Sequence, residues 1–193
     1  MNITLPISEE EVRKLRAGDV IYITGKIFLA RDAAHKKLLS LSDDQIPINP
    51  REMAMYHCGP VVKKVGEEWK VVSAGPTTSA RMEIFEYEFI KRFRVPIIIG
   101  KGGMGERTQK ALMEFGAVYT AYTGGAGALA AKAIKRVVDV FFLEELGMPE
   151  AVWVFEVENF GPLTVAMDSH GNNLYRDVQN KAAKRKEEIV TSF

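Results

Sequence analysis

The sequence predicts an α/β protein in which two regions of sheet share a layer of helices. Strand-like segments joined by short turns dominate residues 1–74, and strand and helix patterns alternate from there to about residue 167. This combination is typical of layered α/β architectures. The 193 residues are enough for one full hydrophobic core, and no internal repeat or low-complexity linker divides them. We therefore expect one compact domain over residues 1–193.

The amino-terminal part is expected to hold short strands and two helices. Ser8 and Glu11 have the spacing of a capping box, which predicts a short helix that ends at Gly18. A second helix is expected over residues 31–39, with Arg31 and Asp32 in its first turn. An arginine is unfavourable there because the helix dipole favours an anion, and such a local misfit often marks a functional residue. The expected strands are 20–24, 27–30 and 55–58, followed by a hairpin of 61–65 with 69–74.

The next part alternates helices and strands. Met82, Phe85, Phe89 and Phe93 recur at helical spacing, directly after the hydroxyl residues of the segment 77–79. A short buried strand is expected to follow and to end in a glycine turn. The remaining expected elements are a strand at 95–99, a helix at 106–115, a strand at 117–123, a long helix at 128–146, strands at 152–157 and 163–167, and a charged helical tail at 177–193.

Composition limits the classes of partner. Lys and Arg number 26 against 25 Asp and Glu, so no basic excess indicates nucleic acid or an anionic membrane. The first residues lack the layout of a secretory signal, and no apolar run is long enough to span a bilayer. The single cysteine, Cys58, excludes an internal disulfide and cannot by itself ligate an iron–sulfur cluster. We expect a cytoplasmic protein with neither nucleic-acid nor membrane partners.

Three cations follow strand-like segments and begin a helix or a glycine turn: Arg31, Arg81 and Lys101. Ligands of open α/β sheets bind beyond the carboxyl ends of the strands, and helix N-termini there favour anions. Arginine forks pair with carboxylates in a bidentate manner, so this rim is a candidate site for a small dianion. Gly102 and Gly103 are expected to leave their backbone N–H groups uncovered. The alternative is that each cation is an ordinary solvated residue and that the glycines form a plain turn.

Two neighbouring threonines allow two interpretations. Thr77 and Thr78 are good N-cap residues, and a threonine hydroxyl could also move a proton if neighbouring charge activates it. Asp32 could orient Arg31 or could simply favour the start of its helix. His35 is expected to be a hydrogen-bonded structural residue rather than a catalyst.

Other motifs give weaker signals. His57 is expected to be structural, and Cys58 to be a small buried apolar residue. The stretch GKGGMGERT lacks the ending of a phosphate loop, and TGGAGALA lacks the spacing of a dinucleotide fingerprint. Neither stretch therefore predicts nucleotide binding.

Five stretches occur in a characteristic order: GDVIYITGKIFLARDAAHK, YHCGP, SAGPTTSARM, GKGGM and FGPLTVAMDSHGNN. In this, the chain resembles the beta subunit of class I iron–sulfur hydro-lyases, and in particular that of a two-subunit class I fumarate hydratase. The same sequence type occurs in the beta subunit of L(+)-tartrate dehydratase and as the C-terminal domain of single-chain class I fumarases. The resemblance extends from about Ile3 to about Tyr175.

The resemblance implies a fold and a cofactor. The fold is a swivelling three-layer β/β/α domain with a mainly parallel central sheet. The cofactor is a [4Fe–4S] cluster, held by three cysteines of a separate alpha subunit, so that a hetero-oligomer is expected. The fourth iron would bind the substrate hydroxyl and one carboxylate as a Lewis acid.

The resemblance also implies roles for individual residues. Arg31, Arg81 and Lys101 match the clamps that hold the substrate carboxylates. Thr77 matches the residue proposed to take the C3 proton. Supporting positions, none of them a metal ligand, are Asp32, His35, Thr78 and Gly102.

The leading hypothesis is therefore a hydro-lyase subunit for the reversible hydration of fumarate to (S)-malate, a step of the tricarboxylic acid cycle. The close alternative is the beta subunit of L(+)-tartrate dehydratase, which forms oxaloacetate, and the stretch FGPLTVAMDSHGNN is slightly more similar to that type. A stand-alone dicarboxylate-binding module is a more remote alternative. A purely structural assembly subunit is another, and it predicts that the three cations are dispensable.

Overall fold

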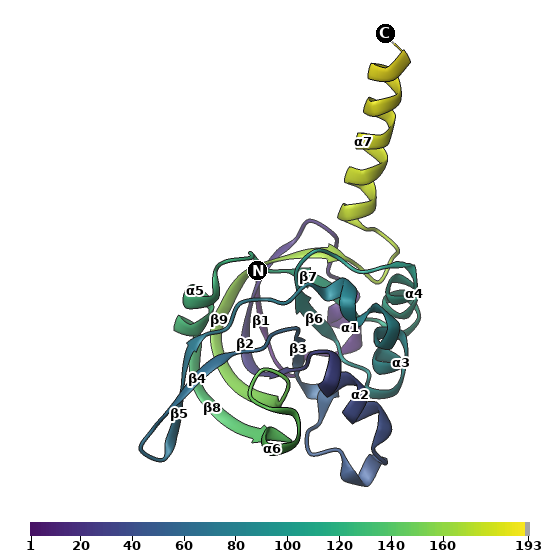
Figure 1. Cartoon of the computed structure of the whole chain (residues 1–193). Helices are drawn as coiled ribbons and strands as arrows, with labels where there is room; N and C mark the ends of the chain where they lie inside the picture. The colour runs from purple at the N-terminus through teal and green to yellow at the C-terminus, as the bar shows by residue number, and fades with distance from the viewer. Residues whose placement is uncertain (192–193) are drawn as a thin grey trace.

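Figure 1 shows the computed structural model, which describes residues 1–191; the last two residues of the expected tail lie outside the described part. The strands are β1 (Asn2–Thr4), β2 (Val20–Leu29), β3 (Ala54–Tyr56), β4 (Val61–Val65), β5 (Glu68–Ser73), β6 (Ile97–Gly100), β7 (Val118–Ala121), β8 (Ile134–Phe141) and β9 (Val152–Met167). The helices are α1 (Glu9–Val12), α2 (Asp32–Ser40), α3 (Glu83–Phe93), α4 (Glu106–Phe115), α5 (Gly127–Lys132), α6 (Leu143–Leu146) and α7 (Leu174–Thr191). Short 3-10 turns occupy Asp43–Gln45, Pro50–Glu52 and Ser79–Met82.

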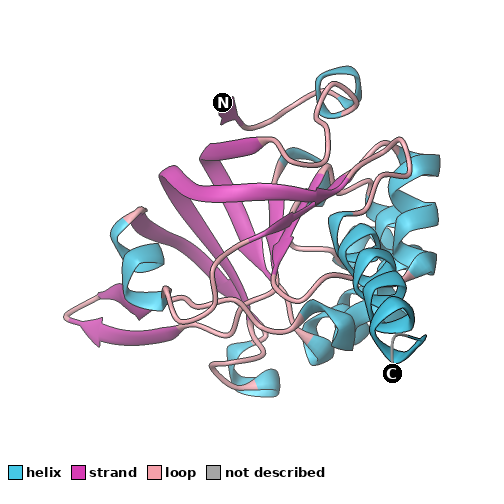
Figure 2. Ribbon diagram, turned by 90° about the horizontal axis from the view of Figure 1, so that it is seen from above, coloured by secondary structure: helices cyan, strands magenta, loops and turns pink. Residues whose placement is uncertain are grey.

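The main sheet closes on itself. Its strand order is β1-β2-β3-β6-β7-β9-β8, and β9 also pairs with β2. The pairs from β1 to β7 are parallel, whereas β9 runs antiparallel to β7, β8 and β2. Strands β2, β3, β6, β7 and β9 therefore form a ring, and Figure 2 shows the larger helices gathered to one side of the strands. The prediction of a layered α/β domain with a mainly parallel central sheet is confirmed.

Alternate residues of the strands face two different cores. Ile27 and Leu29 belong to one buried cluster together with Phe155, and Phe28 between them belongs to the other. The second cluster includes Phe89 of α3, and so it lies between the sheet and its helices. This period of two is what a strand buried on both faces requires.

The prediction of a long helix at 128–146 is wrong. The segment forms the short helix α5, the strand β8 and the short helix α6. The sequence of β8, IKRVVDVF, is rich in β-branched residues, and it pairs antiparallel with the first half of β9. Pairing with a strand that comes later in the chain therefore decides the structure of this segment.

Two pairs of expected strands are each one continuous strand. Residues 20–24 and 27–30 join in β2, where Gly25 (φ +134°) lies at a register shift instead of a turn. A Cβ at Gly25 would lie 2.8 Å from Leu5 Cβ, so glycine is required there. Residues 152–157 and 163–167 join in the same way in β9. The predicted hairpin is confirmed as β4 and β5.

The carboxyl ends of the parallel strands lie at one edge of the sheet. Strand β2 leads into Arg31, β3 into His57, and β6 into Lys101. Arg31 and Lys101 thus follow strands of the main sheet, whereas the strand before Thr77 and Arg81 is β5, which pairs with β4 in a separate two-stranded sheet.

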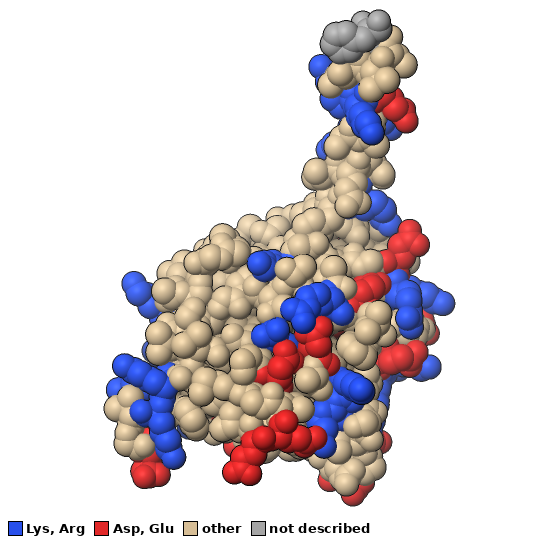
Figure 3. All heavy atoms as spheres, viewed as in Figure 1, with Lys and Arg blue, Asp and Glu red and all other residues tan. Residues whose placement is uncertain are grey.

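Helix α7 projects from the body of the domain (Figure 1) and has no buried residue. Figure 3 shows basic and acidic side chains around it, as the charged tail predicts. No helix among residues 1–191 combines the length and the apolar character needed to cross a membrane.

Candidate active site

Three segments from different parts of the chain meet at the rim. The backbone N–H of Thr77 donates to the carbonyl of His57 (2.7 Å), and that of Ser79 donates to the carbonyl of Lys101 (2.9 Å). Thr78 and Lys101 also form an isolated parallel bridge. The segment 77–79 is thus laid between the ends of β3 and β6, as an extra strand would be.

Arg31 lies at the N-cap position of α2 but makes no capping hydrogen bond. Glu150 supplies the cap instead, because its Oε2 accepts from the N–H of Ala33 (3.0 Å) while its Oε1 lies 3.1 Å from Arg31 Nε. A Cβ at Gly59 would lie 2.7 Å from Arg31 Nη1. Glycine at position 59 therefore makes room for this guanidinium, which Glu150 holds in place.

Arg81 is exposed and pairs with Asp32, with 2.9 Å between Nη2 and Oδ2. Asp32 therefore supports Arg81, and the expectation that it could orient Arg31 is wrong. The side chain of Arg81 is 53% exposed, which leaves donors of the guanidinium directed to solvent.

Lys101 is partly buried and forms no ion pair with any residue of the described chain. Its side chain lies beside Gly124, where an added Cβ would be 3.6 Å from Lys101 Cδ. Gly102 (φ +79°) and Gly103 (φ +74°) form the turn that follows. Their backbone N–H groups face the hydroxyl of Tyr175, whose pKa is raised by burial although these two groups oppose the shift. The Tyr175 hydroxyl thus lies close to the N–H groups that were expected to be uncovered.

The predicted N-cap role of the threonines is not observed. Thr78 occupies the N-cap position of the turn Ser79–Met82 without a capping hydrogen bond from its side chain. Thr77 is partly exposed, and within residues 1–191 its hydroxyl has no hydrogen-bond partner. A hydroxyl without a structural partner at a rim of cations is available to a ligand.

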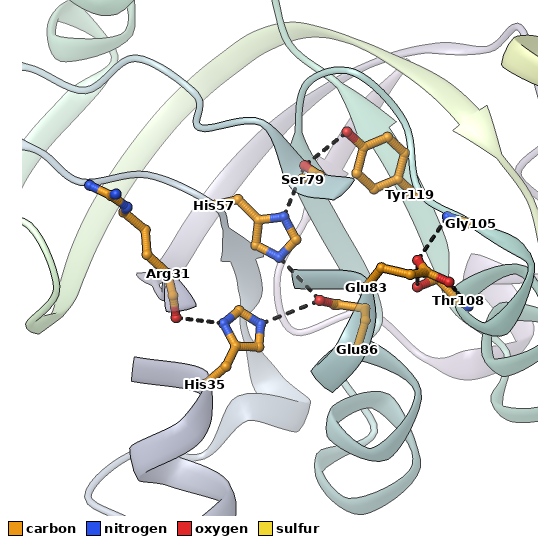
Figure 4. Close-up of polar contacts among 9 residues, drawn as sticks. All are labelled: Arg31, His35, His57, Ser79, Glu83, Glu86, Gly105, Thr108 and Tyr119. Carbon is orange, nitrogen blue, oxygen red and sulfur yellow. Dashed lines mark hydrogen bonds and ion pairs between the residues drawn. The ribbon is translucent and has the colours of Figure 1, made fainter. Parts of the chain in front are cut away.

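A polar cluster lies completely buried beneath the rim (Figure 4). Glu86 Oε2 is 3.3 Å from His35 Nε2 and 3.3 Å from His57 Nε2. The other nitrogen of each ring contacts a different neighbour. His35 Nδ1 lies 2.8 Å from the carbonyl oxygen of Arg31, and His57 Nδ1 lies 2.9 Å from Ser79 Oγ. Tyr119 donates its hydroxyl to Ser79 Oγ (3.0 Å). All of these side chains are 0% exposed.

Burial and charge act in opposite directions on this cluster. Burial is the largest influence on Glu86 and favours its protonated form, but the two imidazoles together outweigh it and lower the pKa of Glu86 to about 2. Burial lowers the pKa of His57, against the attraction of Glu86. We therefore describe Glu86 as a carboxylate and His57 as a neutral imidazole.

The same cluster is the group of the described residues whose potential metal-ligating atoms converge, all within 4.8 Å of one another. It offers three ligands and no exposed side, whereas a closed structural site usually has four. Cys58 offers none, because it is buried and burial raises the pKa of its thiol far above the ordinary value.

The structure thus joins some predicted residues more directly than others. Thr78 and Lys101 are bridged, and Arg81 and Asp32 form an ion pair. His35 is hydrogen-bonded, as expected of a structural residue, because its Nδ1 lies 2.8 Å from the carbonyl oxygen of Arg31. The guanidinium of Arg31 is instead held by Glu150.

Sequence reasoning missed Glu86, Ser79 and Tyr119. A signal for Glu86 was present, since it stands four residues after Met82 and three before Phe89, on the buried face of α3. An acid on an apolar stripe indicates a buried partner.

Comparisons with known proteins identify the family of the chain. The family described as Fumarase C-terminus matches residues 1–178. A protein of Methanocaldococcus jannaschii with the provisional name L(+)-tartrate dehydratase subunit beta is 49% identical over 186 residues, 95% of each chain. The L(+)-tartrate dehydratase subunit beta of Escherichia coli K12 is 43% identical over 97% of this chain and 92% of its own.

A longer protein of Geobacillus stearothermophilus, provisionally named fumarate hydratase class I, is 41% identical over 96% of this chain and 35% of its own length. Fold and matches together define the class of protein, a layered α/β domain of the hydro-lyase beta-subunit type. The chain belongs to the Fumarase C-terminus family, which agrees with the resemblance seen in its motifs.

Proposed function

We propose that this chain is the beta subunit of a hydro-lyase that removes water from a C4 2-hydroxy dicarboxylate, in a complex with an alpha subunit. The observation that carries the proposal is the Thr77 hydroxyl, which no residue of the described chain binds, on a segment bridged to Lys101. Arg31 lies at the start of α2, and Arg81 forms an ion pair with Asp32, the residue that follows Arg31. The relatives' names and the family match support the same class of reaction.

In the proposed mechanism the cations hold the two carboxylates of the substrate. Arg31, Arg81 and Lys101 orient the C3–H bond towards Thr77, whose side-chain oxygen takes the proton once neighbouring cations have favoured its deprotonated form. The electron pair of the C3–H bond forms the C2=C3 double bond as the C2–O bond breaks, and the departing hydroxide would be received by an acid that the alpha subunit supplies. Negative charge grows on the neighbouring carboxylate as the proton departs, and fixed cations stabilise it. Thr78, Gly102, Asp32 and His35 have supporting roles.

A [4Fe–4S] cluster is expected in enzymes of this type, and residues of this chain do not fit one. Cluster irons need several thiolates, whereas the chain has a single cysteine, Cys58, with a buried thiol held protonated. We propose that the alpha subunit carries the cluster and that this chain contributes the carboxylate clamps and the base. We also propose that residues 1–193 form a single domain and that the complex is cytoplasmic.

Two substrates are candidates. L(+)-tartrate, giving oxaloacetate, is favoured by the names of two relatives that match this chain over nearly their whole lengths. The pair (S)-malate and fumarate is favoured by the relative named as a class I fumarate hydratase. Both are 2-hydroxy dicarboxylates and differ by one hydroxyl group, so the same clamps serve either.

The test is a dehydratase assay on the tagged chain, recovered anaerobically from its own cells together with its partner. L(+)-tartrate and (S)-malate are offered separately, and a Lys101→Met complex prepared in the same way is the matched control. We expect oxaloacetate or fumarate to form in the wild-type complex and to decrease strongly in the control. A lone chain that is inert on both substrates would contradict the proposal.

A further inference from the structure

The buried cluster beneath the rim forms one continuous line of polar contacts (Figure 4). It runs from the carbonyl of Arg31 through His35, Glu86, His57 and Ser79 to the hydroxyl of Tyr119, with separations of 2.8, 3.3, 3.3, 2.9 and 3.0 Å. Its members come from α2, β7, the end of β3 and the segment 79–86. Every side chain in it is fully buried. Elements far apart in the sequence therefore share one polar line.

The protons of this line can be assigned from its two ends. A carbonyl only accepts, so His35 Nδ1 must donate to Arg31. At the other end Tyr119 donates to Ser79, so the Ser79 hydroxyl is free to donate to His57 Nδ1. His57 then carries its proton on Nε2, directed at Glu86. His35 Nε2 lies 3.3 Å from the same carboxylate oxygen, Glu86 Oε2.

Each part of the rim is attached to a member of this line. The His57 carbonyl accepts from the N–H of Thr77, and the Ser79 N–H donates to the carbonyl of Lys101. The Gly103 N–H faces the Tyr119 hydroxyl. The carbonyl of Arg31 is the remaining end. The segments that carry the proposed base and two of the proposed clamps, Arg31 and Lys101, are therefore tied to residues whose side chains form this line.

We infer that His35, Glu86, His57, Ser79 and Tyr119 are positioning residues that hold the segments of Thr77, Arg31 and Lys101 in one fixed relation. The inference rests on the proposed function for its catalytic consequence. Glu86 is the centre, because it is the one acid that both imidazoles face. Small displacements of reacting groups cost large factors in rate, so a rigid support beneath the rim has a direct catalytic value.

The first test removes one hydroxyl group at a time. Ser79→Ala breaks the line between Tyr119 and His57, and Thr120→Val is the matched control. Thr120 is also fully buried, and its hydroxyl donates to the carbonyl of Ile98 outside the line. In the complex with the alpha subunit, Ser79→Ala should reduce kcat/KM for L(+)-tartrate or (S)-malate by about ten- to a hundredfold. Thr120→Val should lower the thermal stability by a similar amount but leave kcat/KM unchanged. Equal decreases of kcat/KM in both variants would overturn the inference.

A double variant tests whether the line acts as a unit. His35→Gln and Ser79→Ala alter opposite sides of Glu86, so the double variant should lose less kcat/KM than the product of the two single losses. His35→Gln combined with Thr120→Val should show the simple product. Simple products in both combinations would contradict a connected line.

The third test does not depend on activity, so it separates failure of this inference from failure of the proposed function. Nitrogen-15 NMR of the full chain should show a proton on Nδ1 of His35, and on Nε2 but not Nδ1 of His57. Ser79→Ala should shift the backbone amides of Thr77 and Gly103, and Thr120→Val should not. A reversed His57 tautomer, unmoved amides, or one bound metal ion per chain that Glu86→Gln removes would overturn the inference.

Discussion

Two turns of this molecule satisfy their polar groups in opposite ways. The turn after β9 is built around Asp168, whose carboxylate accepts from the N–H groups of Ala17 and His170 and twice from Asn172, at 2.8–3.0 Å. The rim that carries Thr77 keeps its backbone bonds but leaves its hydroxyl without a partner in the described chain. Both turns belong to stretches that carry the family resemblance.

The difference in hydrogen bonding indicates that the Asp168 turn stabilises the fold, whereas the Thr77 segment has a polar group left for a ligand. Asp168 is fully buried and every oxygen of its carboxylate is used, while its carbonyl also accepts from Gln109 Nε2 (2.9 Å). A polar residue that is satisfied inside its own chain has nothing left to offer a substrate. At the rim, by contrast, the Thr77 hydroxyl and the Lys101 ammonium have no side-chain partner in the described chain, and Arg81 keeps exposed donors beside its ion pair with Asp32.

The largest expected effect is that of Thr77→Val. The substitution removes the proposed base, and general acid–base groups contribute roughly 10²–10⁴-fold, so kcat should decrease by about that factor. The melting temperature should not change, because the hydroxyl has no partner in the described chain. Steady-state kinetics and thermal unfolding of the same complex measure both quantities. Thr77→Ser keeps the hydroxyl and should retain most activity; an inactive serine variant would argue against a hydroxyl base.

Arg81→Lys should have the next largest effect. The charge is kept but the bidentate fork is lost, and a charge-assisted hydrogen bond contributes roughly 1.5–3 kcal/mol. We expect kcat/KM to decrease about ten- to a hundredfold. Arg107→Lys, an exposed arginine of α4, is the matched control and should have no effect. Near-normal activity of Arg81→Lys would refute its role as a clamp.

Asp168→Asn should affect stability but not turnover. The carboxylate accepts hydrogen bonds from partly buried N–H groups, and disturbing such an acceptor costs about 1–3 kcal/mol of unfolding free energy. Chemical denaturation measures this loss, and kinetics of the folded complex should stay unchanged. A large decrease of kcat in this variant would remove the contrast between the two turns.

The contribution of Asp168 should also depend on pH in a defined direction. Burial favours the protonated form most strongly, but the hydrogen bonds from Asn172, Ala17 and His170 outweigh it and lower the pKa. A group whose pKa is lowered on folding stabilises the fold above its ordinary pKa, here 3.8. This stabilisation is lost as the pH falls through the lowered value. The wild-type and Asp168→Asn stabilities should therefore converge in acid, and a constant difference between pH 7 and pH 3 would contradict the assignment.

Local signals in the sequence predicted much of the fold. The capping box at Ser8, the hairpin of β4 and β5 and the helix α4 are encoded within a few residues each, and all are confirmed. The helix that the capping box begins ends at Val12, however, and not at Gly18 as expected. The ring of strands could not be predicted in this way, because β2 and β9 are more than a hundred residues apart. The expected helix at 128–146 failed for the same reason, since β8 depends on its pairing with β9.

The sequence pointed to the rim residues of the candidate site but not to the buried cluster beneath them. The cations and Thr77 stand next to strand ends and glycine turns, which the sequence marks clearly. Glu86 stands in a charged helix and resembles a solvated residue until its place on the apolar stripe is noticed. Its partners His35 and His57 come from other elements, and only the packing of α2 and α3 on the strands brings them within 3.3 Å.

The central claim is that this chain holds the carboxylates of the substrate. The most direct test is a crystal structure of the complex with its alpha subunit, prepared anaerobically and soaked with the substrate that it turns over. We predict that the carboxylates contact Arg31, Arg81 and Lys101 and that C3 faces the Thr77 hydroxyl. Carboxylates bound without contact to any of these four residues would contradict the account.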